Sequence, residues 1–168
     1  MIHIVVTKIG GRLLEYVSVD IIKYILLVIM LLIVSITDIK EFRIPNTILG
    51  SFILIRGGIL IYELSQKTVY KDNVLSSLVM ALGIFLIGIF MKLIIGDGIG
   101  FGDIKLLIVV VFYMGATKGV YILYSSIFIM GVIDVIILAL RFKTRKDAMP
   151  FAPAVLLGTI LTGVFIRI

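Results

Sequence analysis

Long apolar runs dominate this chain of 168 residues, and short polar stretches separate them. A helix needs about 20 mainly apolar residues to cross the hydrocarbon core of a membrane, within a range of about 17–25. The pattern predicts six candidate spans, at residues 19–37, 47–64, 74–95, 104–114, 119–140 and 151–168. We therefore expect an all-α polytopic membrane protein with about six transmembrane helices, whose membrane-embedded domain covers residues 19–168.

The first 18 residues have a different character, because Lys8, Arg12 and Glu15 interrupt their apolar positions. A cleavable signal peptide would show a long apolar region before a small-residue cleavage site, and this stretch does not. We expect residues 1–18 to form an N-terminal segment at the membrane surface.

The fourth apolar run is too short to cross a membrane by the same rule, and the glycine-rich stretch at residues 96–102 precedes it. Non-helical backbone is tolerated at membrane depth only where protein or a water-filled cavity covers it. The pattern predicts a re-entrant stretch here, and a functional site close to it.

Composition supports a membrane protein and narrows its chemistry. Hydrophobic residues make up 61% of the chain and charged residues 15%, whereas soluble domains have about 45–50% and about 25%. The absence of cysteine excludes disulfides, cysteine-ligated metals and a thiol nucleophile. His3 is the one histidine, which argues against a Ser-His-Asp triad or a histidine-rich metal site. Carboxylates, hydroxyls, lysines and backbone groups remain as the candidates for any chemistry.

The net charge of +6 does not indicate a nucleic-acid partner, because the basic residues lie in short stretches between apolar runs. Such stretches set membrane topology, with the positive loops in the cytoplasm. The densest one joins the last two spans and contains Arg141, Lys143, Arg145 and Lys146. We therefore expect a multi-pass protein of the plasma (inner) membrane, with the loops after spans one, three and five in the cytoplasm and both termini outside it.

Two aspartates stand at the predicted cytoplasmic boundary: Asp38 ends the first span and Asp103 opens the fourth. Two facing carboxylates can hydrolyse a peptide bond, because one takes a proton from water while the other, protonated, polarises the carbonyl. The helix ends place the negative charge mainly on Asp103, at a helix N-terminus, rather than on Asp38, at a C-terminus. This chemistry needs no metal and no cofactor, and we expect neither.

Three stretches together resemble the type IV prepilin peptidases and their archaeal preflagellin relatives, a group of GxGD-type aspartyl proteases. They are Asp38 followed by Ile44-Pro45-Asn46, then Gly100-Phe101-Gly102-Asp103-Ile104-Lys105-Leu106, then Pro150-Phe151-Ala152-Pro153. Their order and spacing are specific, and the resemblance covers roughly residues 19–168.

The resemblance implies that Asp38 and Asp103 are catalytic. It also implies a supporting or substrate-binding role for the residues around them in these motifs: Gly100, Gly102, Pro45, Asn46, Pro150 and Pro153. Many members have glutamate where Asp97 stands, so Asp97 is either a supporting carboxylate or a loop residue.

The implied partner is a prepilin-like precursor with a short basic leader and an apolar helix, cut at the cytoplasmic face, with membrane lipids around the enzyme. Long bacterial members carry a cytoplasmic insert with paired Cys-x-x-Cys motifs and methylate the new terminus. Here there is no cysteine and only a short loop after the first span, so we expect a peptidase without methyltransferase activity.

Other functions stay open at this point. One is a presenilin-like intramembrane protease, which would cleave within a transmembrane helix. Another is a proton-coupled transporter with Asp38, Asp103 and Asp134 as a relay, and a third is a structural subunit of a secretion machine. Among the other charged residues, we expect Arg56 and Asp134 to pair across the bundle and Lys105 to extend toward the headgroups. The sequence leaves the oligomeric state and the precursor undetermined.

Overall fold

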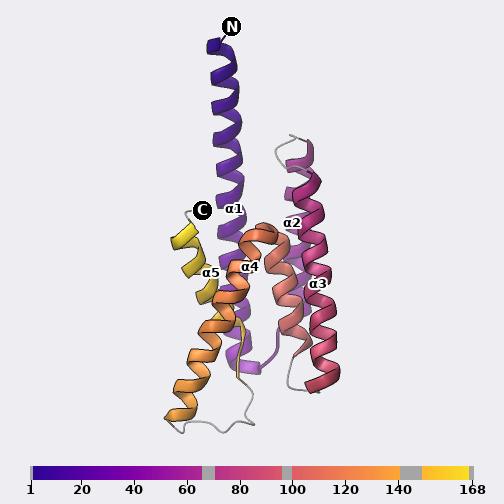
Figure 1. Cartoon of the computed structure of the whole chain (residues 1–168), viewed down its shortest axis with the longest axis vertical. Coiled ribbons are helices and arrows are strands. Elements are labelled where there is room, and N and C mark those ends of the chain that lie inside the picture. Colours follow the sequence, from indigo (N-terminus) through magenta and orange to yellow (C-terminus); the bar gives the residue numbers. More distant parts are fainter. Residues whose placement is uncertain (1, 66–70, 96–99, 141–148, 167–168) are drawn as a thin grey trace.

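The computed structural model describes residues 2–65, 71–95, 100–140 and 149–166, with side chains described within 19–65, 74–94, 100–140 and 149–165. Five helices follow in order: α1 (Ile2–Glu41), α2 (Asn46–Ser65), α3 (Lys71–Ile95), α4 (Phe101–Ala139) and α5 (Ala152–Ile166). They form an elongated bundle, and no strand occurs among these residues (Figure 1). The predicted all-α fold is confirmed.

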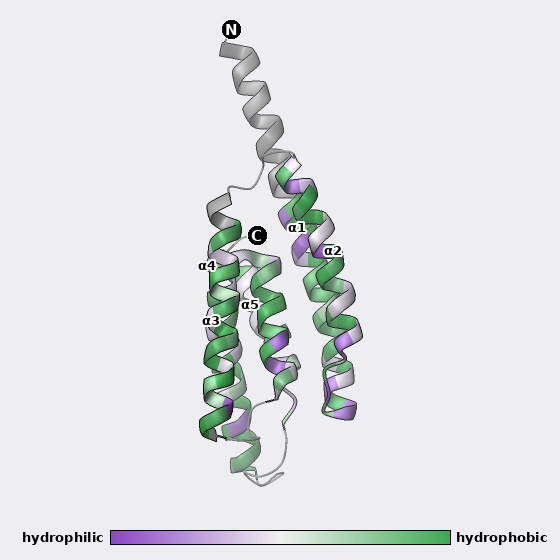
Figure 2. Cartoon of the chain, turned by 90° about the vertical axis from the view of Figure 1, so that its right-hand side faces the viewer, coloured by the Kyte–Doolittle hydropathy of each residue, from purple (hydrophilic) through white to green (hydrophobic). Residues whose placement is uncertain are grey.

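Four of the helices are long and apolar enough to cross a membrane, and α5 is a shorter apolar helix. Hydrophobic residues occur along most of the length of the helices (Figure 2), and many large ones are exposed. Leu54, Leu93 and Phe165 are each more than three-quarters exposed. A surface with this much exposed apolar area suits lipid and not water, so the chain is a membrane protein.

The fourth and fifth predicted spans are the two halves of α4, which folds back on itself at Gly115 (φ 83°, ψ 169°; Figure 1). In a straight helix, Val111 and Gly119 would lie about 12 Å apart. Instead, a Cβ added to Gly119 would lie 2.8 Å from the Val111 side chain. The first half rises only about 21 Å, less than the roughly 30 Å of a hydrocarbon core. The reversal therefore lies at membrane depth, and the six predicted spans are present as five helices.

The first half of α4 packs in the centre of the bundle. Its buried residues lie on more than one face of the helix, as expected for a helix surrounded by others; they are Ile104, Leu106, Val109, Val110, Val111 and Tyr113. One face each of α1 and α5 packs against it. The fully buried members of this core are Leu106, Val109, Val110, Tyr113 and Ile122 of α4, Leu27, Met30, Leu31 and Val34 of α1, and Ala152 and Val155 of α5.

One end of the bundle gathers the C-terminal end of α1 and the N-terminal ends of α2, α4 and α5 (Figure 1). At the other end, α1 continues without a break through residues 2–18. The boundary expected at residue 18 is therefore not a helix boundary, and the location of residues 1–18 at the membrane surface stays a prediction.

Candidate active site

Asp38 points into the bundle because it continues the buried face of α1. It follows the core residue Val34 by one helical turn, and it is only 5% exposed. The helix ends at Glu41, and Phe42 takes a left-handed conformation with φ 50°. The N–H of Phe42 donates to the carbonyl of Asp38 at 2.9 Å, which is the pattern of a helix C-cap. The cap holds the last turn of α1, and so the aspartate, in place.

The loop after α1 then packs on the start of α4. Ile44 lies against Gly102, where an added Cβ would meet the Ile44 Cβ at 3.0 Å. Pro45 precedes the first residue of α2, and its carbonyl accepts the N–H of Leu49 at 3.3 Å. Pro45 therefore stands at the N-cap position, whose carbonyl accepts the first hydrogen bond of a helix. Because α2 begins directly after this short loop, the Ile-Pro-Asn motif lies next to the Gly-x-Gly-Asp motif.

Asp103 lies in the first turn of α4, and it begins the buried face that continues through Leu106 and Val110. Its carboxylate bends back toward the helix start and accepts a hydrogen bond from the backbone of Gly100. An acid at this position of a helix often binds the N-cap residue in this way. Asp103 is therefore held by its own helix start and directed at the interior.

The two glycines of the motif are required for space. Gly100 has φ −72° and ψ 134°, an extended conformation that any residue can adopt. A Cβ on Gly100 would lie 3.0 Å from Oδ2 of Asp103. Among the described residues, Gly115 is the one glycine with a left-handed conformation. Glycine is needed at position 102 because Ile44 of the loop approaches it closely, and at position 100 because the Asp103 carboxylate does. Neither position needs the backbone freedom of glycine.

The Pro-Phe-x-Pro motif contributes a donor to the other aspartate. The N–H of Ala152, the first residue of α5, donates to Oδ2 of Asp38 at 2.9 Å. Pro153 has no N–H of its own, and the carbonyl of Phe151 accepts the N–H groups of Ala154 and Val155. Pro150 and Pro153 thus flank the one backbone donor that reaches Asp38 from this helix end.

The structure brings the two predicted aspartates together. They are close enough for the charge of Asp38 to act on Asp103. Each carboxylate also faces a helix N-terminus, α5 for Asp38 and α4 for Asp103. The sequence predicted the negative charge mainly on Asp103, because only Asp103 was expected to face a helix N-terminus. Since both carboxylates face one, the helix ends do not favour ionisation of either aspartate over the other.

Polar contacts join the rim of the site. Nζ of Lys105 donates to Oδ1 of Asn46 at 3.0 Å, linking α4 to the start of α2. Lys105 thus has a protein partner in addition to the headgroup contact expected from the sequence. Nζ of Lys92 lies 4.0 Å from the centre of the Phe101 ring, a cation–π contact that links the last turn of α3 to the first residue of α4.

The other charged residues considered in the sequence lie away from this site or outside the described residues. Asp97 and the basic cluster at residues 141–146 lie outside the described residues. The predicted Arg56–Asp134 pair is wrong: Nη1 of Arg56 donates to Oε2 of Glu63 at 2.8 Å. Oδ1 of Asp134 is buried and has no partner within the described part of the chain. Arg56 and Glu63 are two turns apart on one face of α2, a spacing that the sequence shows.

Two further features escaped the sequence interpretation. The backbone donor of Ala152 carries no side-chain signal. Ser35, one turn before Asp38 on the same face of α1, has a buried hydroxyl without a partner among the described residues; its spacing from Asp38 was visible in the sequence. No group of three or more His, Cys, Asp or Glu side chains in the described ranges could hold a metal ion.

Comparison with known proteins identifies the family. The family model of the type IV leader peptidases matches residues 25–167, a stretch that holds both aspartates and all three motifs. The chain belongs to the type IV leader peptidase family. A relative within the curated proteins is the prepilin leader peptidase/N-methyltransferase of Bacillus subtilis (strain 168), 28% identical over 150 residues.

This alignment covers 89% of the chain but only 58% of the Bacillus subtilis protein. The chain thus spans little more than half the length of this family member. No solved structure matches the chain significantly.

Proposed function

We propose that the chain is a membrane aspartyl endopeptidase that removes the short basic leader from prepilin-like precursors. One observation carries the proposal: Asp38 and Asp103 come from distant parts of the chain and interact at one end of the bundle. Membership of the type IV leader peptidase family favours this reaction over presenilin-like cleavage and over proton-coupled transport. The peptidase domain would cover residues 19–168.

Two carboxylates are sufficient for the reaction. The ionised carboxylate takes a proton from water, and the water oxygen attacks the carbonyl carbon of the scissile peptide. The protonated carboxylate gives its proton to the carbonyl oxygen, so a tetrahedral diol forms. The C–N bond then breaks as the nitrogen receives a proton, leaving a carboxylic acid and a free amine. The N–H of Ala152 and the backbone of Gly100 would hold Asp38 and Asp103 in place during these steps.

We place this site at the cytoplasmic face of the membrane. Lys40 and Arg43 are exposed at the same end of the bundle, where α1 ends and its loop begins. Positive residues flanking a span favour the cytoplasmic side. A precursor whose apolar helix lies in the membrane would present the junction with its leader at this boundary.

The proposal does not include methylation of the new terminus. Residues 42–45 are all that joins α1 to α2, so the cytoplasmic insert of the long bacterial members has no counterpart between these helices. The test is to incubate purified protein with a prepilin-like precursor and S-adenosylmethionine, and to determine the mass of the product. A trimmed, unmethylated product supports the proposal. An untrimmed precursor contradicts peptidase activity, and a product heavier by one methyl group contradicts the proposed absence of methyltransferase activity.

A further inference from the structure

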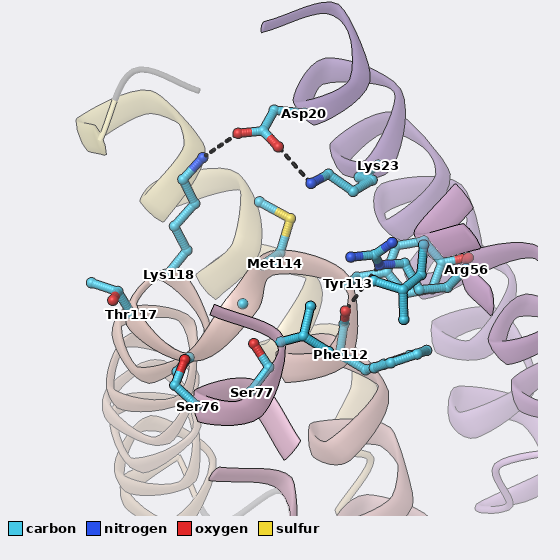
Figure 3. Close-up of a pocket in the computed structure, with 14 residues that line it drawn as sticks. Asp20, Lys23, Arg56, Ser76, Ser77, Phe112, Tyr113, Met114, Thr117 and Lys118 are labelled. Carbon is cyan, nitrogen blue, oxygen red and sulfur yellow. Dashed lines mark hydrogen bonds and ion pairs between the residues drawn. The ribbon is translucent and has the colours of Figure 1, made fainter. Parts of the chain in front are cut away.

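A second polar site lies at the other end of the bundle. Asp20 precedes Asp38 by about 27 Å along α1. Next to it, a cavity of about 210 Å³ opens between α1, α2, α3 and the reversal of α4 (Figure 3). Four of its lining side chains are charged: Asp20, Lys23, Arg56 and Lys118. Ionisable groups within a membrane protein are costly, and their presence indicates a function.

Part of this charge supports the fold. The reversal at Gly115 frees the carbonyl of Phe112, which would accept the N–H of residue 116 in a continuous helix. Nε of Arg56 donates to this carbonyl at 3.0 Å. Glu63, only 1% exposed, then accepts from Arg56 and from Lys23, each at 2.8 Å. Arg56 and Glu63 thus have a structural role behind the cavity.

The remaining charges are not balanced. Lys23 and Lys118 both reach Asp20, at 2.5 and 3.3 Å. The described residues of this cluster are three cations (Lys23, Arg56 and Lys118) and two acids (Asp20 and Glu63), which leaves 3 − 2 = +1. Lys118 is the most open cation, since its side chain is 28% exposed whereas that of Lys23 is 10% exposed. The excess positive charge is therefore most accessible at Lys118.

The backbone adds to the positive character. Gly115, Ala116 and Thr117 line the cavity, where the second half of α4 begins. The first N–H groups of a helix have no partner within it, and its dipole favours an anion at that end. Ser76 and Ser77 of α3 line the cavity beside this helix start (Figure 3), and Oγ of Ser77 would lie 3.8 Å from a Cβ added to Gly115. Cations and backbone amides together are donors that bind a phosphate group.

We propose that this cavity binds the phosphate group of an anionic glycerophospholipid, with Lys118 as the main cation. Asp20 lies about 27 Å along α1 from Asp38, close to the roughly 30 Å thickness of a hydrocarbon core. The end of the cavity at Asp20 therefore lies near the membrane boundary, where headgroups are found, and the reversal of α4 lies deeper. Leu60, Val74 and Met114 also line it and provide apolar contact for the glycerol end of the acyl chains. A free phosphate ion would use the same donors. This inference is independent of the proposed peptidase activity.

The experiment uses the full chain in detergent, with dihexanoyl phosphatidylglycerol and dihexanoyl phosphatidylcholine as probes. Native mass spectrometry gives the bound fraction of each lipid. We expect phosphatidylglycerol to bind and phosphatidylcholine to bind much more weakly. Lys118→Met should raise the dissociation constant for phosphatidylglycerol about tenfold, the usual order for one hydrogen bond to a charged group. Lys118→Arg should restore binding, and Lys40→Met, at the other end of α1, should leave it unchanged.

Inorganic phosphate separates the two sources of the ligand. We expect phosphate to displace phosphatidylglycerol from the wild-type protein, and not to displace the lipid that still binds weakly to Lys118→Met. This result would show that both ligands use the site at Lys118 and would support the proposal. If phosphate binds in a Lys118-dependent way and the lipid does not bind, the ligand is the free anion and the lipid proposal is overturned. Equal binding of both lipids by wild type overturns it without any variant, so the test stands even if Lys118→Met does not fold.

Discussion

The N–H of Ala152 and Oδ2 of Asp38 form a hydrogen bond of 2.9 Å, although 114 positions separate these residues. It fixes the first residue of α5 to the last turn of α1, and it gives one of the two candidate catalytic carboxylates its orientation. The bond also explains why a motif near the end of the chain belongs to the site.

Ala152→Pro tests this bond, because proline lacks an N–H and is favoured at the first position of a helix. We expect kcat for precursor cleavage to fall about 10- to 100-fold, as a hydrogen bond to a charged group contributes about 1.5–3 kcal/mol, with little change in KM. Ala152→Gly keeps the N–H and should stay near wild type. Unchanged kcat in Ala152→Pro, in a protein that melts at the wild-type temperature, would contradict the role of this bond.

Gly102→Ala should impair the site through packing. The new Cβ would meet Ile44 at 3.0 Å, so the loop after α1 must shift away from α4. We expect a loss of cleavage of about tenfold or more, because small displacements of catalytic groups are costly. Gly83→Ala in α3 is the matched control, since nothing lies within 4 Å of its added Cβ. Similar rates for the two variants would show that the contact with Ile44 is not limiting.

The sequence predicted much of this architecture, and the reasons are physical. Spans are visible as apolar runs, and the inward direction of Asp38 can be derived from its spacing to Val34 and Leu31 on one helix face. The fourth run is short because a break follows it, at Gly115, whereas the sequence pattern predicted a re-entrant stretch before it. Of that stretch, residues 96–99 lie outside the described residues. Gly115, where the chain reverses, stands between two apolar runs, so the break left a trace in the sequence.

Other features have no local signal. The donor to Asp38 is a backbone group, and any residue other than proline at position 152 would supply it. The partner of Arg56 was predicted across the bundle, whereas Glu63 lies two turns along the same helix. That pairing depends on Lys23 and on the carbonyl of Phe112, which only the packing of three helices brings to one place.

Glu63 should be among the most sensitive positions for stability. It accepts from Lys23 and Arg56 while almost fully buried, so Glu63→Leu leaves the buried Arg56 without its acid and Lys23 with Asp20 alone. We expect a loss of about 3–5 kcal/mol, measured by thermal or denaturant unfolding in detergent. The double variant Glu63→Leu with Arg56→Met should recover part of this loss. The control is Glu41→Gln at an exposed position; equal effects of Glu63→Leu and Glu41→Gln would refute the prediction.

Ser35 offers the opposite case. Its hydroxyl is buried without a partner among the described residues, a situation that costs about 1–3 kcal/mol. Ser35→Ala removes the unpaired group, and we expect the melting temperature to stay level or rise. Ser126→Ala should lower it, because the buried Ser126 hydroxyl donates to the carbonyl of Ile122 at 2.6 Å. A clear decrease for Ser35→Ala would show that this hydroxyl has a partner in the folded protein.

The central claim is that Asp38 and Asp103 act as one catalytic pair, and precursor cleavage by purified Asp38→Asn and Asp103→Asn tests it most directly. Each substitution keeps the shape of the side chain and removes one ionisable carboxyl, with exposed Glu41→Gln as the control. At equal amounts of folded protein, we predict a loss of at least about 10³-fold in each aspartate variant, and wild-type rates in the control. Substantial cleavage by either Asp38→Asn or Asp103→Asn would remove that residue from the mechanism and contradict the account.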